Sequence, residues 1–184
     1  MNLKHLSIKS FLKNLYFSFI AYFYNNIVTF IPFYFLRLFY LRYIYRIKIG
    51  SKTFIHMGVR FDKKVIIGNH TVVGRNCVLL GEIIVGNNVS ITAETYIFSS
   101  SHMVNDSHFN CFYKKVVIED YVWVGARAMI LPGVILSKGS VVGANSTVTK
   151  NVAEYSIVVG SPAREIAKRS SNLSYNLNYF PFFQ

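Results

Sequence analysis

Large apolar residues recur at every sixth position through most of the chain. The repeat forms two blocks, one starting at Ile49 and the other at Ile118. Its fifteen positions are Ile49, Ile55, Phe61, Ile67, Val73, Leu79, Val85, Ile91, Ile97, Ile118, Val124, Ile130, Leu136, Val142 and Val148. A period of six matches neither an α-helix nor a heptad, whereas short strands with regular corners return one side chain to the interior per hexad. The repeat therefore predicts an all-β fold of stacked coils, with three hexads in each coil.

Smaller residues accompany this repeat at fixed offsets. The residue four positions later is usually small or β-branched, and the residue that follows directly is often glycine, as at Gly50 and Gly68. We expect the large and small residues to fill a narrow apolar prism, and the glycines to adopt unusual φ angles at its corners. A sandwich with regular turns is the alternative, which fifteen matches in two phased blocks disfavour.

The segment VVIEDYVWVGARAMILPGVILSKGSVVGANSTVTKNVAEYSIVVGSPAREI gives the chain a specific resemblance. It resembles the hexapeptide-repeat acyltransferases, in particular the maltose/galactoside and polysaccharide O-acetyltransferase branch, which includes enzymes that acetylate surface polysaccharides. The likeness covers about residues 46–169. It implies a left-handed parallel β-helix, a homotrimer, acetyl-CoA as co-substrate, a sugar or polysaccharide acceptor, and no metal.

The break between the two blocks predicts a loop. Ile97 and Ile118 are twenty-one residues apart, so the repeat resumes three residues out of phase, and we expect a loop at about residues 99–117. His102 lies near its start, and a neutral imidazole can remove a hydroxyl proton near pH 7. In the resembling enzymes a histidine at this place acts as general base, so the resemblance implies that His102 is catalytic.

Three further residues are candidates for the acceptor side of the site. Asp106 either holds His102 in the required tautomer or makes a local turn. His108 either orients the substrate or lies in solvent. Trp123 directly precedes the apolar Val124, so we expect its side chain to project outward. The resemblance implies that Trp123 lines the acceptor site, with subunit packing as the alternative.

The donor side is assigned by the resemblance, because the chain has neither a Rossmann nor a Walker motif. Ala126 and Ala144 match small residues along a groove between two subunits, where the pantetheine arm lies in the resembling enzymes. Thr149 and Lys150 match residues that contact the CoA end, and Arg164 matches a basic residue near the phosphates. Ordinary solvated charge is the alternative for the two cations.

The basic charge of the chain is concentrated near its beginning. Residues 1–64 hold eleven Lys or Arg and one acid, a net +10, whereas residues 65–184 hold nine and seven, a net +2, within a formal total of +12. This distribution does not favour nucleic acid as a partner. Arg37, Arg42 and Arg46 recur at near-helical spacing among aromatic residues, which favours helices lying on an anionic membrane face. Packing against the β-helix and a membrane-spanning helix are the alternatives.

These observations divide the chain into three segments. We expect an aromatic and basic helical segment at 1–45, the acyltransferase domain at 46–169 and a tail at 170–184. The helical segment at 1–45 carries no cleavage site typical of a signal peptide. The two cysteines, Cys77 and Cys111, suit a reducing cytosol, and we interpret both as structurally incidental. We therefore expect a cytoplasmic O-acetyltransferase peripheral to the inner face of the membrane. A sugar or antibiotic N-acetyltransferase and a catalytically silent scaffold are the alternatives.

Overall fold

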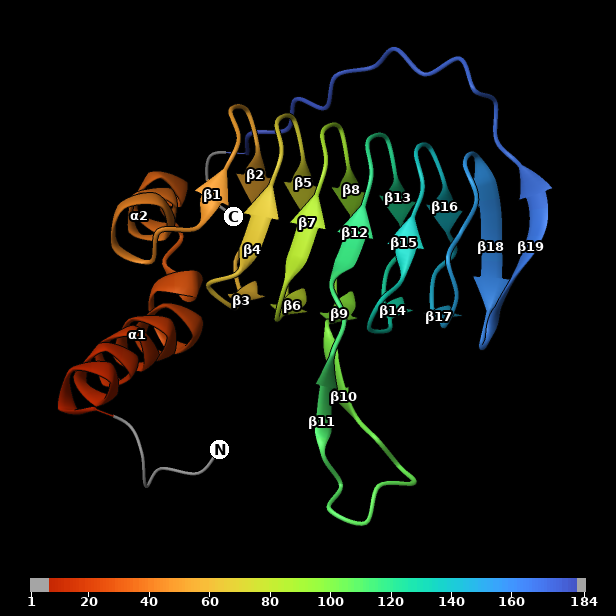
Figure 1. The fold of residues 1–184 in the computed structure, drawn as a ribbon. Coiled ribbons are helices and arrows are strands. Elements are labelled where there is room, and N and C mark those ends of the chain that lie inside the picture. Colours follow the sequence, from red (N-terminus) through yellow and green to blue (C-terminus); the bar gives the residue numbers. More distant parts are fainter. Residues whose placement is uncertain (1–6, 182–184) are drawn as a thin grey trace.

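A computed structural model describes residues 7–181, which form a helical segment, a parallel β-helix and an extended tail (Figure 1). The helical segment comes first. It consists of α1 (Ile8–Asn26), the 3-10 helix η2 (Val28–Phe30), α2 (Tyr34–Phe39) and the π-helix η3 (Tyr40–Ile44).

The strands of the β-helix form three sheets, which we call A, B and C. Sheet A contains β1 (Lys48–Ile49), β4 (Val65–Ile67), β7 (Ile83–Val85), β12 (Val116–Ile118) and β15 (Ile135–Leu136). Sheet B contains β2 (Phe54–Ile55), β5 (Val72–Val73), β8 (Ser90–Ile91), β13 (Trp123–Val124), β16 (Val141–Val142), β18 (Ser156–Gly160) and β19 (Ala163–Lys168). Sheet C contains β3 (Arg60–Phe61), β6 (Val78–Leu80), β9 (Tyr96–Phe98), β14 (Met129–Ile130) and β17 (Thr147–Val148).

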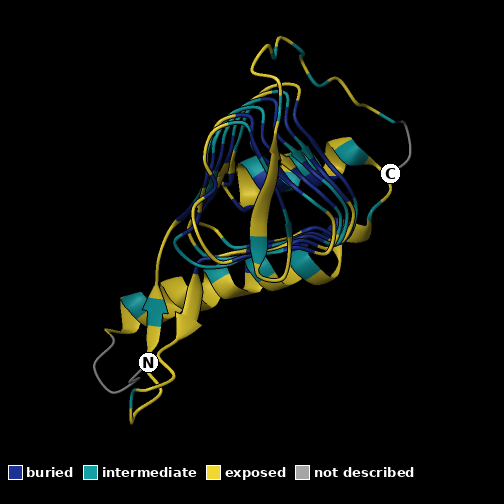
Figure 2. Ribbon diagram, turned by 90° about the vertical axis from the view of Figure 1, so that its right-hand side faces the viewer, coloured by how far each residue is buried: buried dark blue, intermediate teal, exposed yellow. Residues whose placement is uncertain are grey.

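The hexad repeat predicted this architecture correctly. Ile49 pairs in parallel with Ile67, which pairs with Val85, so one coil takes eighteen residues. Fourteen of the fifteen repeat positions are buried, and Ile49, in the first coil, is half-buried. Figure 2 shows the triangular cross-section of the coils, with the buried stretches of the ribbon in dark blue. The small residues that alternate with them, such as Cys77, are also buried.

The glycines that directly follow the large apolar positions do not have the expected role. The positive φ angles that the corners require fall mostly three residues after the large apolar position. They are adopted mainly by other residues, for example Asn76 (φ 56°) and Asn88 (φ 54°), and by glycine at a few corners such as Gly58 (φ 76°). Gly50 is needed for another reason, because a Cβ there would lie 2.5 Å from the carbonyl carbon of Gly68. Glycine therefore allows successive coils to approach each other closely, and asparagine tolerates the left-handed backbone.

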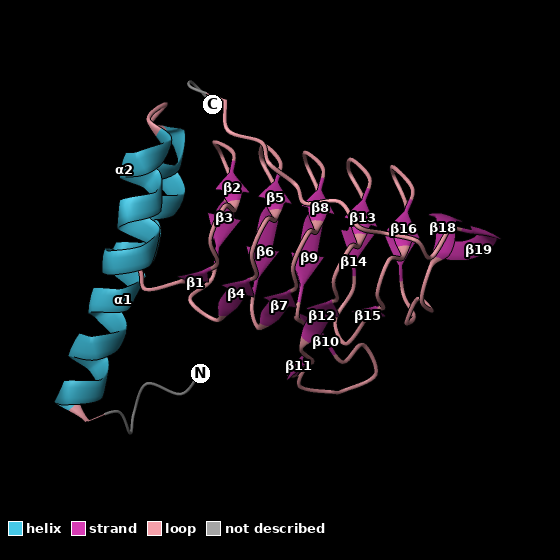
Figure 3. Ribbon diagram, turned by 90° about the horizontal axis from the view of Figure 1, so that it is seen from above, coloured by secondary structure: helices cyan, strands magenta, loops and turns pink. Residues whose placement is uncertain are grey.

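The helical segment caps the first coil (Figures 1 and 3). Asn25 makes two hydrogen bonds to the edge strand β3, because its Nδ2 donates to the Phe61 carbonyl at 3.0 Å and its Oδ1 accepts from the Phe61 N–H at 2.9 Å. The Tyr45 hydroxyl donates to the same carbonyl at 2.7 Å, and the Thr29 hydroxyl donates to the Val59 carbonyl at 2.9 Å. Backbone groups at the edge of the first coil thereby find partners without another strand.

Two of the three regularly spaced arginines belong to this cap, which corrects the interpretation of their spacing as a membrane face. Arg37 is buried and donates to the carbonyls of Ile31 and Ile55. Arg42 donates to the carbonyl of Ile49 at 3.1 Å and to that of the following glycine at 2.8 Å. The alternative of packing against the β-helix holds for these two residues, whereas Arg46 is exposed. Among the described residues, no helix combines the length and the apolar character that crossing a membrane requires.

The tail returns along sheet B toward the first coil (Figure 1). The Leu177 N–H donates to Asn88 Oδ1 at 3.2 Å, and the Leu177 carbonyl lies 3.3 Å from His70 Nδ1. Further along, the ring of Tyr179 packs on the ring of His56 with 5.4 Å between centroids. The tail therefore covers part of the outer surface of sheet B.

The cap makes Asn25 a stability determinant. We expect Asn25→Ala to lower the free energy of unfolding by about 1–3 kcal/mol, because it leaves the Phe61 N–H and carbonyl at the edge strand without this partner. Asn26→Ala is the matched control, since the exposed Asn26 side chain bonds only to the Tyr22 carbonyl in its own helix. Urea denaturation of both variants measures the effect, and equal losses would contradict a specific role for the cap.

Candidate active site

A hairpin interrupts the β-helix between sheets C and A. Its strands β10 (Ser100–His102) and β11 (Cys111–Tyr113) pair antiparallel and project from the corner between these two sheets (Figures 1 and 2). Val85 pairs with Ile118, thirty-three residues later instead of eighteen, so fifteen extra residues enter at this corner. The hairpin lies where the break in the hexad repeat predicted a loop.

His102 is exposed at the end of β10, opposite Cys111. Its Nδ1 lies 2.9 Å from the Phe109 carbonyl, and its ring stacks on the Phe109 ring with 4.3 Å between centroids and 9° between planes. Because a carbonyl oxygen only accepts, Nδ1 must carry the hydrogen. The lone pair of the neutral ring is then at Nε2, where it can accept a proton from a substrate hydroxyl.

Phe109 adopts a backbone conformation that is unusual for a bulky residue. Its φ is 50°, in the left-handed region that residues at the corners of the coils also adopt. This conformation closes the hairpin turn and directs the Phe109 carbonyl at His102. The sequence contained no signal for this pairing, because a backbone carbonyl seven residues away is not visible in a side-chain pattern.

The other polar residues of the hairpin tip hold the turn together. Asp106 accepts from the His108 N–H at 2.8 Å and from Asn110 Nδ2 at 2.9 Å, which lower the pKa of its carboxyl group. This is the local turn considered above, and the contact that orients His102 comes from the Phe109 carbonyl instead. The side chain of His108 is 83% exposed and lies near Ser107.

Cys111 is the residue of this site that sequence reasoning missed. Its Sγ lies 3.4 Å from His102 Nδ1 and 3.7 Å from Nε2, so it is in direct contact with the imidazole. It was interpreted as incidental because two cysteines form neither a disulfide framework nor a metal-ligand pattern. The antiparallel register of the hairpin brings Cys111 and His102 opposite each other.

Trp123 lies on the outer surface of sheet B, as its place before Val124 predicted. It is 50% exposed, and its Nε1 donates to Thr92 Oγ1 at 3.3 Å. In the triangular cross-section, sheet B faces away from the corner that carries the hairpin (Figure 2). One chain therefore does not bring His102 and Trp123 together.

The two alanines of the predicted donor site form a column at the corner between sheets B and C. Ala126 and Ala144 follow equivalent strands in successive coils, because Val124 pairs with Val142. The coils are in close contact here, since the Asn145 N–H donates to the Ala126 carbonyl at 2.9 Å. Ala144 is exposed, so the small side chains leave the backbone of this corner open to a ligand.

The remaining predicted donor residues lie at the last coils. Lys150 and Arg164 are exposed and line one groove of about 310 Å³, so the structure brings these two cations together. Thr149 precedes Lys150 and is also exposed. Glu165 lines the same groove and is paired with Lys168. Two cations beside one groove are suited to phosphate groups. Within residues 7–181, no cluster of three or more His, Cys, Asp or Glu side chains suitable for a metal ion is found.

Comparison with protein families and curated proteins places the chain among the hexapeptide-repeat transferases. Residues 115–150 match the family model for the bacterial transferase hexapeptide, and residues 64–99 match that for the hexapeptide repeat of succinyl-transferase. The chain is 32% identical to the putative colanic acid biosynthesis acetyltransferase WcaF of Escherichia coli, over 72% of this chain and 75% of WcaF. It is 34% identical to the galactoside O-acetyltransferase of Lactococcus lactis, over 60% of this chain and 45% of that protein.

The chain spans about half the length of some of the curated relatives it matches. Among solved structures, it resembles the hexapeptide-repeat acetyltransferase VCA0836 of Vibrio cholerae in complex with acetyl-CoA, with a TM-score of 0.75, 26% identity, and coverage of 92% of this chain and 94% of that chain. The repeats, the parallel β-helix with its hairpin and the extent of the match to WcaF lead to one conclusion: the chain is an enzyme of the hexapeptide-repeat acyltransferase family.

Proposed function

We propose that this protein transfers an acetyl group from acetyl-CoA to a hydroxyl of a sugar in a surface polysaccharide or its precursor. The observation that carries the proposal is the imidazole of His102, whose Nδ1 is held by the Phe109 carbonyl so that Nε2 is available as a base. The acetyl-CoA complex of VCA0836 supports the donor, and the relationship to WcaF and to a galactoside O-acetyltransferase supports a sugar acceptor.

In this mechanism the protein supplies a base and two binding surfaces. Nε2 of His102 accepts the proton of the sugar hydroxyl while the hydroxyl oxygen bonds to the thioester carbonyl carbon. The carbon–sulfur bond then breaks, and the CoA sulfur takes the proton that Nε2 accepted, so that CoA leaves as a thiol and the imidazole is neutral again. Trp123 contacts the acceptor. The donor is held by five residues of the later coils, which are Ala126, Ala144, Thr149, Lys150 and Arg164. Asp106 supports the hairpin turn that carries the base.

Removing the base should stop transfer without releasing the donor. We expect His102→Ala to lower the rate of sugar acetylation by about 10²–10⁴-fold, because general-base catalysis typically contributes this much. Calorimetry should show acetyl-CoA binding as in the wild type. His108→Ala is the matched control from the same hairpin and should keep full activity. Wild-type turnover in His102→Ala would exclude this mechanism.

We also propose that the active enzyme is a homotrimer, in which each site lies between two chains. The support is the placement of the hairpin and Trp123 on opposite sides of the cross-section. A ring of three chains lets the hairpin of one chain approach sheet B of the next, and repeats the same contact three times. His102 and Trp123 of different chains then serve one acceptor.

Mixed trimers test this arrangement. His102→Ala and Trp123→Ala chains should each be poorly active alone at low acceptor concentration. Refolded or co-expressed in equal amounts, they should recover about a quarter of wild-type activity, because each mixed ring contains one intact site. Light scattering should give the mass of a trimer. An active monomer, or mixtures as inactive as the parents, would show that the site lies within one chain.

A membrane surface is a proposed partner of the helical segment. The outward side chains of α1 are apolar and exposed, and the first acidic residue of the chain is Asp62. Exposed bases such as Lys9 and Lys13 lie between these apolar side chains. Aromatic and aliphatic groups mixed with cations are typical of helices that lie in the interface of anionic bilayers. The enzyme would then work at the cytoplasmic face.

Substitutions on this outer surface test the proposal without disturbing the cap. We expect Leu12→Ser/Leu15→Ser to weaken binding to vesicles of phosphatidylcholine with phosphatidylglycerol by about tenfold or more, because both exposed leucines would lose burial in the bilayer. Ile166→Ser, which alters an exposed apolar residue on β19, is the control. Equal sedimentation of all three proteins with the vesicles would contradict membrane docking.

A further inference from the structure

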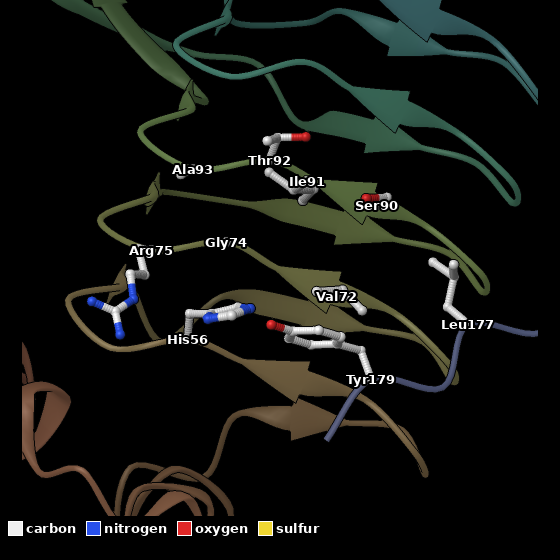
Figure 4. Close-up of a pocket in the computed structure, with 10 residues that line it drawn as sticks. All are labelled: His56, Val72, Gly74, Arg75, Ser90, Ile91, Thr92, Ala93, Leu177 and Tyr179. Atoms are coloured by element: carbon white, nitrogen blue, oxygen red, sulfur yellow. The ribbon is translucent and has the colours of Figure 1, made fainter. Parts of the chain in front are cut away.

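A groove on sheet B lies beneath the tail, at the side of the molecule that carries Trp123. It has a volume of about 430 Å³. Its lining residues come from three successive coils and from the tail: His56, Val72, Gly74, Arg75, Ser90, Ile91, Thr92, Ala93, Leu177 and Tyr179 (Figure 4). We call it the tail groove. Neither the hexad repeat nor the resemblance pointed to it, because the tail lies outside both.

The floor and walls of the tail groove differ in chemistry. The floor is built from residues of β5 and β8 and those directly after these strands, including Val72, Gly74, Ser90 and Thr92. One wall is aromatic, where Tyr179 packs on His56. Trp123 stands on the next strand, β13, and bonds to Thr92, a floor residue. A floor that combines the apolar Val72 with the hydroxyls of Ser90 and Thr92, beside aromatic side chains, is suited to the apolar face and the hydroxyls of a pyranose ring.

His56 adds a buried polar group to this wall. It is only 9% exposed, and its Nδ1 has no hydrogen-bond partner in the part of the chain that the structure describes. Burial and the nearby guanidinium groups of Arg75 and Arg37 lower the pKa of its imidazole, which keeps the ring neutral. Because Nδ1 is itself buried, the neutral ring contributes an uncharged aromatic surface to this wall.

The charge of the groove favours an anionic ligand. Arg75 lies on the far side of His56 from Tyr179 in Figure 4, and its guanidinium forms no salt bridge with the described residues. None of the lining residues given above is acidic. A carboxylate placed beside Arg75 would gain a charge-assisted hydrogen bond that a neutral sugar cannot form.

We propose that the tail groove is the acceptor subsite and that it takes a pyranose bearing a carboxylate, a uronic acid residue. In this arrangement the sugar ring packs against Tyr179 and its carboxylate pairs with Arg75, while Trp123 borders the groove through its contact with Thr92. The inference rests on the proposed acetyl transfer, and it gives that reaction its substrate class. The base for the bound sugar comes from His102 of the neighbouring chain.

The test compares acidic sugars with their neutral counterparts on the full-length protein. D-glucuronate is paired with D-glucose, and D-galacturonate with D-galactose. Binding is measured by saturation-transfer NMR and acetylation by CoA release. We expect at least one uronate to bind and to be acetylated with a KM about tenfold below that of its neutral partner. Arg75→Gln should remove this difference.

The tail residue gives a second, independent variant. Tyr179→Ala should raise the acceptor KM about tenfold for acidic and neutral sugars alike, because the stacking surface is lost, whereas Tyr179→Phe should retain it. Asn178→Ala, the adjacent tail residue outside the groove, is the control. The KM for acetyl-CoA should be unchanged in all of these variants.

The outcomes separate this proposal from the proposed function. Sugar acetylation that is insensitive to both Arg75→Gln and Tyr179→Ala would overturn the groove as acceptor subsite and leave the acetyltransferase function standing. Uronate binding that depends on Arg75 and Tyr179, without any acetylation, would support the subsite and overturn the proposed reaction. Failure of both uronates to bind better than their neutral partners would overturn the proposed substrate class.

Discussion

Backbone pairing between coils is the interaction on which the rest of this structure depends. Most strands are two or three residues long, and such strands have no stability alone. They persist because each pairs with the strand eighteen residues away, as Ile49 does with Ile67. Because the coils have equal lengths, a residue that points inward in one coil pairs with a residue that points inward in the next. The same register places Ala126 next to Ala144, and Ser90 next to Trp123, on the outside of the coils.

A stack of coils has two open ends, and the first end determines what the helical segment must do. The edge carbonyls of the first coil need donors, which Asn25, Arg37 and Arg42 supply from helices. Using side chains for this purpose avoids an exposed strand edge that would pair with another molecule. It also ties one side of the segment to the β-helix, so the outward side, with exposed residues such as Leu12 on α1 and Phe35 on α2, remains for another partner.

The sequence predicted the core well because the core depends on a local, repeated pattern. Each large residue has the same surroundings as the one six positions away, so spacing alone identifies it. The errors occurred where one residue type serves more than one purpose. Gly50 permits close approach instead of a left-handed turn, and Arg37 binds carbonyls instead of facing a membrane. The spacing of residues in the sequence cannot distinguish these roles, since the roles differ only in which part of the structure the residue contacts.

The candidate site was predictable where the repeat is interrupted and where the repeat turns a residue outward, as at Trp123. The fifteen extra residues must return the chain to sheet A in register, so an insertion can lengthen a corner but cannot shift a strand. This constraint located the hairpin and His102. The contacts made by Phe109 and Cys111 depend on how the hairpin pairs with itself. Those of Tyr179 depend on a tail that crosses the solenoid and meets residues more than one hundred positions earlier. A repeat therefore predicts where a solenoid departs from regularity, whereas the chemistry at that place depends on contacts that the repeat does not encode.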